Sequence, residues 1–141
     1  MTILDRLLNN EPVSPQEIFD FVVAAILAQG RPSMAGSSPD PKCRYRGNQD
    51  AKCAVGHLIP DYIYDEYMEG KSVEHLVRGK DSPYAYLKPH VVLLELLQMA
   101  HDESALISSR NNEPFIPVFI EYVTRVAVNE GLFFDAKELT Q

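Results

Sequence analysis

The sequence predicts a mainly α protein of the α+β kind, with about four packed helices and one small β-hairpin. Three observations predict it: a capped amphipathic stretch near the N-terminus, two apolar helical stretches in the second half, and a turn-rich polar segment between them. A length of 141 residues corresponds to a single globular domain, residues 1–141. The hydrophobic content of 45% likewise indicates a folded chain with its own core.

The first helix signal is Ser14-Pro15-Gln16-Glu17, a capping box with proline at the first helical position. It predicts a helix from Pro15 to about Gln29, ended by Gly30 in a left-handed conformation. Apolar residues at helical spacing mark the face expected to be buried: Ile18, Phe21, Val22, Ala25 and Ile26. Residues 1–10 are expected to form a short helical turn before it.

Two long helices are expected in the second half. Pro89 begins a leucine-rich helix through about residue 102, and its narrow polar face holds Glu95, Gln98 and Asp102. A helix this apolar should be the central core element. Glu113-Pro114 begins the last helix, which Gly131 ends. Shorter helical segments are expected at residues 61–69 and, capped by Ser72, at residues 73–78.

Residues 42–60, KCRYRGNQDAKCAVGHLIP, contain both cysteines, a cluster of basic residues and His57. The turn-forming run Gly47-Asn48-Gln49-Asp50 predicts the β-hairpin over residues 42–55. With the turn centred on Asn48, Cys43 would lie opposite Cys53. Residues 31–42, rich in proline, glycine and serine, are expected to form a flexible loop.

This segment resembles a family of small, mostly uncharacterised proteins encoded by phages and prophages. The similar residues are Cys43-x-Tyr45-Arg46-Gly47 and Lys52-Cys53-Ala54-Val55-Gly56-x-Leu58-Ile59-Pro60-Asp61. Later similar stretches are Met68-Glu69-Gly70, Ala100-His101-Asp102 and Glu130-Gly131-Leu132. The resemblance covers most of the chain from about Ile18 onward. It implies a phage-related origin and a shared fold rather than a particular reaction.

Composition and charge exclude several classes of function. A net charge of −7 disfavours nonspecific binding to nucleic acid, which needs a basic surface. No run approaches the ~18 consecutive apolar residues of a membrane span, and residues 1–12 lack a signal-peptide pattern. Two cysteines do not make a secreted disulfide framework. We therefore expect a cytoplasmic protein with no membrane partner, and the resemblance to phage and prophage proteins implies that the cell is an infected or lysogenic host.

Cysteine and histidine chemistry gives an alternative. Cys53 would be a nucleophile, activated by a helix start and by Lys52, with His101 as general base. Adjacent His101 and Asp102 should point about 100° apart on a helix, so Asp102 is not expected to orient His101. Zinc would be held by Cys43, Cys53, His57 and His101, although Cys-x9-Cys departs from strong zinc motifs. Packed, unreactive thiols are favoured over both, so an enzyme is the less favoured alternative and no cofactor is expected.

A binding function is the favoured hypothesis. Arg44, Tyr45, Arg46 and Tyr62 are the expected contact residues, because arginine and tyrosine dominate binding hot spots. The alternative is that the arginines pair within the chain with the acidic residues that follow: Asp61, Asp65, Glu66 and Glu69. The expected function is that of a small phage-type accessory protein that binds and modulates a host protein. Homo-oligomerisation stays open.

Overall fold

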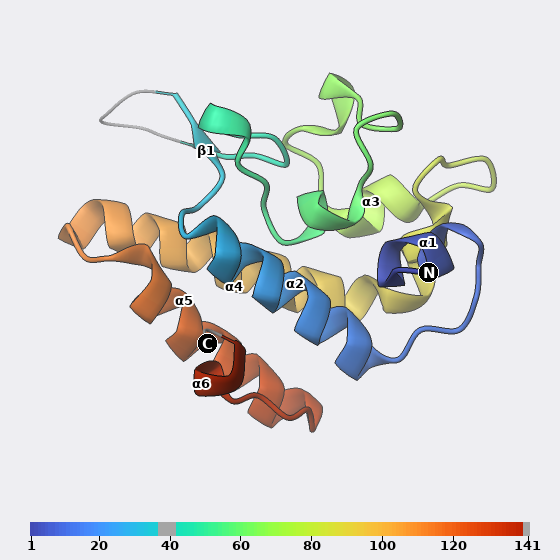
Figure 1. Cartoon of the computed structure of the whole chain (residues 1–141). Coiled ribbons are helices and arrows are strands. Elements are labelled where there is room, and N and C mark those ends of the chain that lie inside the picture. Colours follow the sequence, from blue (N-terminus) through green and yellow to red (C-terminus); the bar gives the residue numbers. More distant parts are fainter. Residues whose placement is uncertain (37–41, 140–141) are drawn as a thin grey trace.

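The computed structural model describes residues 1–36 and 42–139. The fold is mainly helical, with one small antiparallel β-hairpin (Figure 1). This confirms the predicted fold class. The helices are α1 (Ile3–Leu8), α2 (Pro15–Gln29), α3 (Val73–Val77), α4 (Val91–Asn111), α5 (Phe115–Glu130) and α6 (Ala136–Leu139). Short 3-10 turns occur at Asn48–Asp50, Val55–Leu58, Glu66–Met68 and Ala85–His90.

Helix α2 forms with the predicted bounds. The Ser14 side chain accepts a hydrogen bond from the Glu17 N–H, and the Glu17 carboxylate accepts one from the Ser14 N–H. Gly30 ends the helix with a φ of 78°, a left-handed conformation that glycine adopts without a steric cost. The buried aromatic residue on this helix is Phe19, whereas Phe21 is half-buried.

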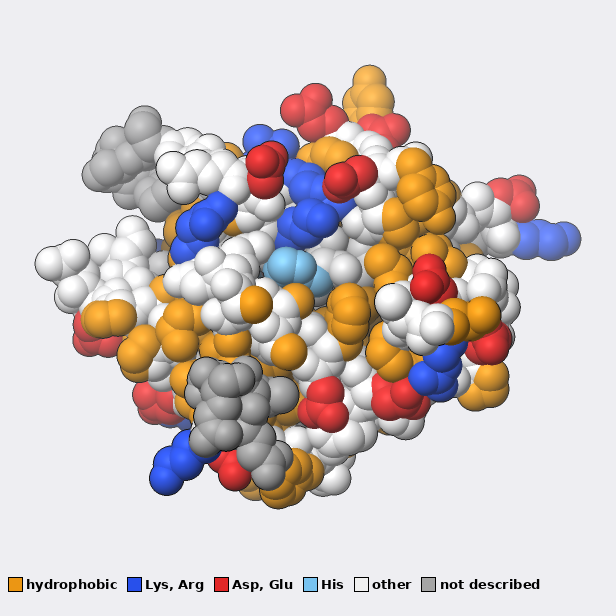
Figure 2. Space-filling model, in the orientation of Figure 1, with side chains coloured by type: hydrophobic (Ala, Val, Ile, Leu, Met, Phe, Trp, Pro, Cys, Tyr) orange, Lys and Arg blue, Asp and Glu red, His pale blue; other side chains and the backbone are white. Residues whose placement is uncertain are grey.

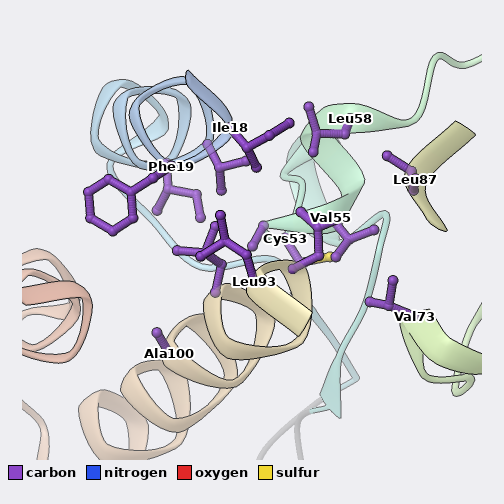
Figure 3. Close-up of a cluster of buried hydrophobic side chains, with 14 of the residues drawn as sticks. Ile18, Phe19, Cys53, Val55, Leu58, Val73, Leu87, Leu93 and Ala100 are labelled. Atoms are coloured by element: carbon purple, nitrogen blue, oxygen red, sulfur yellow. The ribbon is translucent and has the colours of Figure 1, made fainter. Parts of the chain in front are cut away.

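Helix α4 is the central element, as the sequence predicts. It lies between α2 and α5, and Figure 3 shows Ile18 of α2 facing Leu93 of α4. Cys53, Val55 and Leu58 complete this core from the loop side. The helix continues well beyond residue 102, because Ser104 and Ala105 are also buried against the fold. The last helix, α5, begins and ends where the sequence indicates.

The β-hairpin is not at residues 42–55. Strand β1 (Met34–Ala35) pairs antiparallel with β2 (Lys42–Cys43), so Cys43 lies opposite Met34 and not opposite Cys53. Only an isolated bridge between Arg46 and Lys52 remains of the expected ladder. The reason is burial: residues 53–56 are all buried, and a strand with one exposed face cannot bury consecutive side chains.

The expected loop over residues 31–42 is fixed at both ends by this pairing, while its residues 37–41 lie outside the part of the chain that the structure describes. Residues 61–69 do not form a helix beyond the 3-10 turn Glu66–Met68. The predicted Ser72 cap is present, and its side chain accepts a hydrogen bond from the His75 N–H at the start of α3. Among the described residues, no helix has both the length and the apolar character that crossing a membrane requires.

Candidate functional site

Glu69 is the centre of a polar cluster formed by Arg44, Tyr45, Arg46, Tyr64 and Glu69, here called the Glu69 cluster. Its carboxylate accepts hydrogen bonds from the Tyr45 N–H at 2.8 Å, the Arg46 N–H at 3.1 Å and the Tyr64 hydroxyl at 2.6 Å. The side chain of Glu69 is only 13% exposed, and Arg44 Nε lies 3.6 Å from it. A single carboxylate thus joins the segment after β2 to the loop that leads to α3.

Arg46 is held from several directions and has a structural role. Its guanidinium donates to the carbonyls of Gly56 and Ile59 at 3.0 and 2.5 Å and pairs with Asp61 at 3.1 Å. It also lies over the ring of Tyr64, 4.8 Å from the ring centre. The intramolecular pairing considered for the basic residues therefore occurs here, and Arg46 has few donors left for a partner.

Tyr45 is also part of the fold. Its ring is buried, and its hydroxyl donates to the Lys71 carbonyl at 2.6 Å. Burial raises the pKa of this hydroxyl well above its ordinary value. Of the four predicted binding residues, Tyr62 is the one that is largely exposed, at 79%. Arg44 is intermediate in exposure, at 32%: its guanidinium lies 3.6–3.8 Å from Glu69 and Glu66, and its Nε has no hydrogen bond to the described part of the chain.

Two glycines allow the chain to pack closely around this cluster. A Cβ on Gly56 would lie 2.5 Å from the Tyr45 carbonyl oxygen, and one on Gly47 would lie 2.6 Å from both Met34 N and Ser33 Oγ. Such approaches are possible only without a side chain. This requirement gives both glycines of the motif over residues 43–61 a physical role.

His101 is a buried residue with both ring nitrogens occupied. The Ser33 N–H donates to Nε2 at 3.0 Å, which fixes the proton on Nδ1, and Nδ1 donates to the Asp102 carboxylate at 2.8 Å. The expectation that Asp102 cannot orient His101 is therefore wrong, because side-chain rotation overcomes the helical offset. Since Nε2 already accepts a hydrogen bond from the Ser33 N–H, His101 has no free lone pair to act as a base for Cys53.

The four residues considered as zinc ligands do not converge. Ligand atoms of Cys43, His101 and Asp102 lie within 4.8 Å of one another, whereas Cys53 and His57 are outside this group. The Ser33 amide occupies the one lone pair that His101 has for a metal ion. Burial, together with nearby Asp102, raises the pKa of the Cys43 thiol to about 12. These contacts fit a packed polar cluster better than a metal centre.

His57 differs from these residues in its hydrogen bonding. Its Nε2 atom is buried and has no hydrogen-bond partner among the described residues. Burial, with the nearby positive charges of Lys52 and Arg46, lowers the pKa of His57 to about 4. The side chain is therefore neutral at pH 7 and contributes no positive charge to the site.

Cys53 is a packed thiol. Burial raises its pKa to about 12, although the Gly56 N–H donates to the sulfur at 3.4 Å. Above about pH 9 the Cys53 thiol loses its proton in the unfolded chain but keeps it in the folded chain. This group alone should therefore lower the free energy of unfolding by about 1.4 kcal/mol for each further pH unit. Urea unfolding of wild type and Cys53→Ala between about pH 8 and pH 11 measures the difference.

Thiol labelling tests whether the two cysteines are packed and unreactive in the folded protein. We expect slow reaction with a disulfide reagent at neutral pH in the folded protein and rapid reaction in urea, because the thiolate is the reactive form. Equal rates in the two conditions, or a stability difference between wild type and Cys53→Ala that does not change with alkaline pH, would contradict the buried-thiol assignment.

Several residues that organise the site give no motif in the sequence. Ser33, from the segment expected to be a flexible loop, is fully buried, and its hydroxyl lies 2.6 Å and 3.0 Å from the carbonyls of Arg44 and Ala51. The Gln29 amide pairs with both backbone groups of Lys52, and the Gln98 amide oxygen accepts the Val55 N–H. The only sequence signal is their polarity at positions next to apolar faces, and many surface residues share it.

Two grooves border this polar region. The tyrosine groove, of about 490 Å³, is lined by Tyr62, Tyr64, Tyr67, Tyr84 and neighbouring residues of the loop before α3. The α4 groove, of similar volume, lies between α4 and the segments at residues 43–45 and 69–73. Figure 2 shows acidic, basic and hydrophobic side chains interleaved on the face that carries the β-hairpin and these loops.

Comparison with known proteins finds no matching family model, no matching curated protein and no matching solved structure.

Proposed function

We propose that this protein is a small binding protein that recognises a partner protein through the tyrosine groove. The observation that carries the proposal is the exposure of two aromatic side chains on one short loop, Tyr62 at 79% and Tyr67 at 82%. Exposed aromatic rings that lie together are a feature of interaction surfaces, and tyrosine is among the residues that contribute most to protein–protein affinity.

The backbone beneath these two rings is well fixed. The Tyr84 hydroxyl donates to the Ile63 carbonyl at 2.9 Å, and the Asp65 carboxylate accepts the Tyr67 N–H at 2.9 Å. Met68 is buried beneath the same loop. A loop held in this way loses little conformational entropy when a partner binds, which supports a preformed recognition surface.

The charges around the groove favour a partner surface that is apolar at its centre and acidic at its edge. Lys71, His75 and Arg78 line the groove, against one carboxylate, Asp65. Arg78 pairs with Glu74 on the exposed face of α3, so Lys71 has the freer positive charge of the two. The resemblance to phage and prophage proteins supports a host protein as the partner and modulation of that host protein as the function.

The double variant Tyr62→Ala/Tyr67→Ala tests this proposal. Affinity purification with tagged protein should enrich one partner, and affinity for that purified partner should fall by about 30-fold or more in the double variant, the range of hot-spot residues. Phe133→Ala is the matched control, because Phe133 is a ring 65% exposed on another part of the surface. The proposal fails if wild type enriches no specific partner, or if the double variant binds the partner as wild type does.

A further inference from the structure

The α4 groove has opposite charges on its two walls. One wall is a single face of α4, with residues spaced by three or four positions: Glu95, Gln98, Met99, Asp102 and Glu103. The other wall consists of residues 43–45 and 69–73 and brings two cations, Arg44 and Lys71, and one carboxylate, Glu69, to the groove. Its volume of about 490 Å³ is within the range of small-molecule sites.

The carboxylates on the α4 wall lack positive partners. Among the described residues, neither Glu95 nor Glu103 has an ion pair or a side-chain hydrogen bond, and Glu95 is half-buried. Asp102 is already an acceptor for His101 and for the Gln98 amide. This wall therefore presents negative charge that the fold itself does not neutralise.

The opposite wall presents positive charge that is only loosely held. Arg44 Nε is buried and has no hydrogen bond to any described residue, and its nearest carboxylate, that of Glu69, already accepts three other hydrogen bonds. The Lys71 ammonium is exposed and has no ion pair within the described part of the chain. No ion pair within 4.0 Å crosses the groove between these described walls.

We propose that the α4 groove binds a small zwitterion, namely an amino acid or a short peptide with free ends. The carboxylate would meet Arg44 and Lys71, and the ammonium would meet the carboxylates of α4. A ligand with one charge would gain from one wall and be repelled by the other, so the charge arrangement favours a dipolar ion. Met99, which is 59% exposed on the α4 wall, offers an apolar contact for the body of the ligand.

Three probes with the same apolar body separate these contributions: leucyl-leucine, its N-acetylated form and its C-terminal amide. We expect leucyl-leucine to bind with a dissociation constant of about 1 mM or lower and each capped form to bind about tenfold more weakly. Titration followed by nuclear magnetic resonance reports both the affinity and the residues whose signals shift. Free leucine, measured in the same way, distinguishes an amino acid site from a peptide site.

Two exposed residues, one from each wall, provide variants that should fold normally: Glu103→Gln and Lys71→Gln. Each should weaken leucyl-leucine binding about fivefold to tenfold, the loss of one charge-assisted contact. Glu121→Gln on α5 and Lys80→Gln are the matched controls and should bind as wild type does. The proposal is overturned if leucyl-leucine does not saturate the groove by about 10 mM, if the capped forms bind equally well, or if the groove variants behave like their controls.

This inference does not depend on the proposed function, but Lys71 lines both grooves, so Glu103→Gln is the variant that tests the α4 groove alone. Tyr62→Ala/Tyr67→Ala should leave leucyl-leucine binding unchanged, since neither residue lines the α4 groove. Loss of both activities in Glu103→Gln alone would instead indicate one continuous binding surface and would contradict a separate zwitterion site.

Discussion

Glu69→Ala is expected to lower the free energy of unfolding by about 3–5 kcal/mol. The carboxylate accepts the backbone N–H groups of Tyr45 and Arg46 and the hydroxyl of Tyr64. Its removal leaves these donors without their acceptor in a largely buried region, and it leaves Arg44 without its nearest carboxylate. Urea unfolding measures the change, and the thermal midpoint should fall by about 10 °C or more.

Glu66→Ala is the matched control for this substitution. Glu66 has the same side chain and faces the same Arg44, but it is 84% exposed and lies 3.8 Å away. We expect its replacement to change stability by no more than about 0.5 kcal/mol, as for most surface ion pairs. Similar effects of the two substitutions would show that the Glu69 cluster is not a structural centre.

His101→Leu is expected to cost about 2–4 kcal/mol, although leucine suits a buried position. The substitution removes the acceptor of the buried Ser33 N–H and the donor to Asp102. It also removes an edge-to-face ring contact with Phe115, whose ring centre lies 5.8 Å away. Because Ser33 belongs to the segment before β1, we expect that segment to detach from α4 before the rest of the protein unfolds.

Amide hydrogen exchange at Ser33 measures that detachment directly. His101→Gln retains an acceptor near the position of Nε2 and should lose less stability and less Ser33 protection than His101→Leu. His75→Leu is the control, because His75 is exposed at the side of α3 and should have little effect. Unchanged Ser33 protection in His101→Leu would mean that the hydrogen bond to His101 does not hold this segment.

The helices could be predicted because their signals are local. In α2 the capping box, the proline at the first position and the final glycine act within one turn of each helix end, and the observed bounds agree with them. The last helix is defined in the same way by Pro114 and Gly131. For α4 the start was predicted approximately, but the end was not: the helix continues to Asn111 and ends at Asn112 in a left-handed conformation, a local signal that the prediction did not use.

The β-hairpin shows why the polar segment over residues 42–60 was harder to predict than the helices. Its turn residues do turn, with Gln49 and Asp50 at positive φ, but burial of Cys53 and Val55 takes the chain away from β2. The strand partner is then Met34–Ala35, which precedes the segment. A turn signal specifies that the chain reverses, and it does not specify which strand pairs with which.

The sequence by itself determined the fold class, the main helices and the absence of a strong catalytic or metal motif, since each depends on residues close together in the chain. Only the tertiary structure decided the role of each polar residue. Burial turned Tyr45 and Arg46 from expected contact residues into structural ones, and it left Tyr62 exposed. It also brought together Ser33 and His101, which are far apart in sequence. Such roles depend on distance and burial in three dimensions, which residue spacing along one chain does not specify.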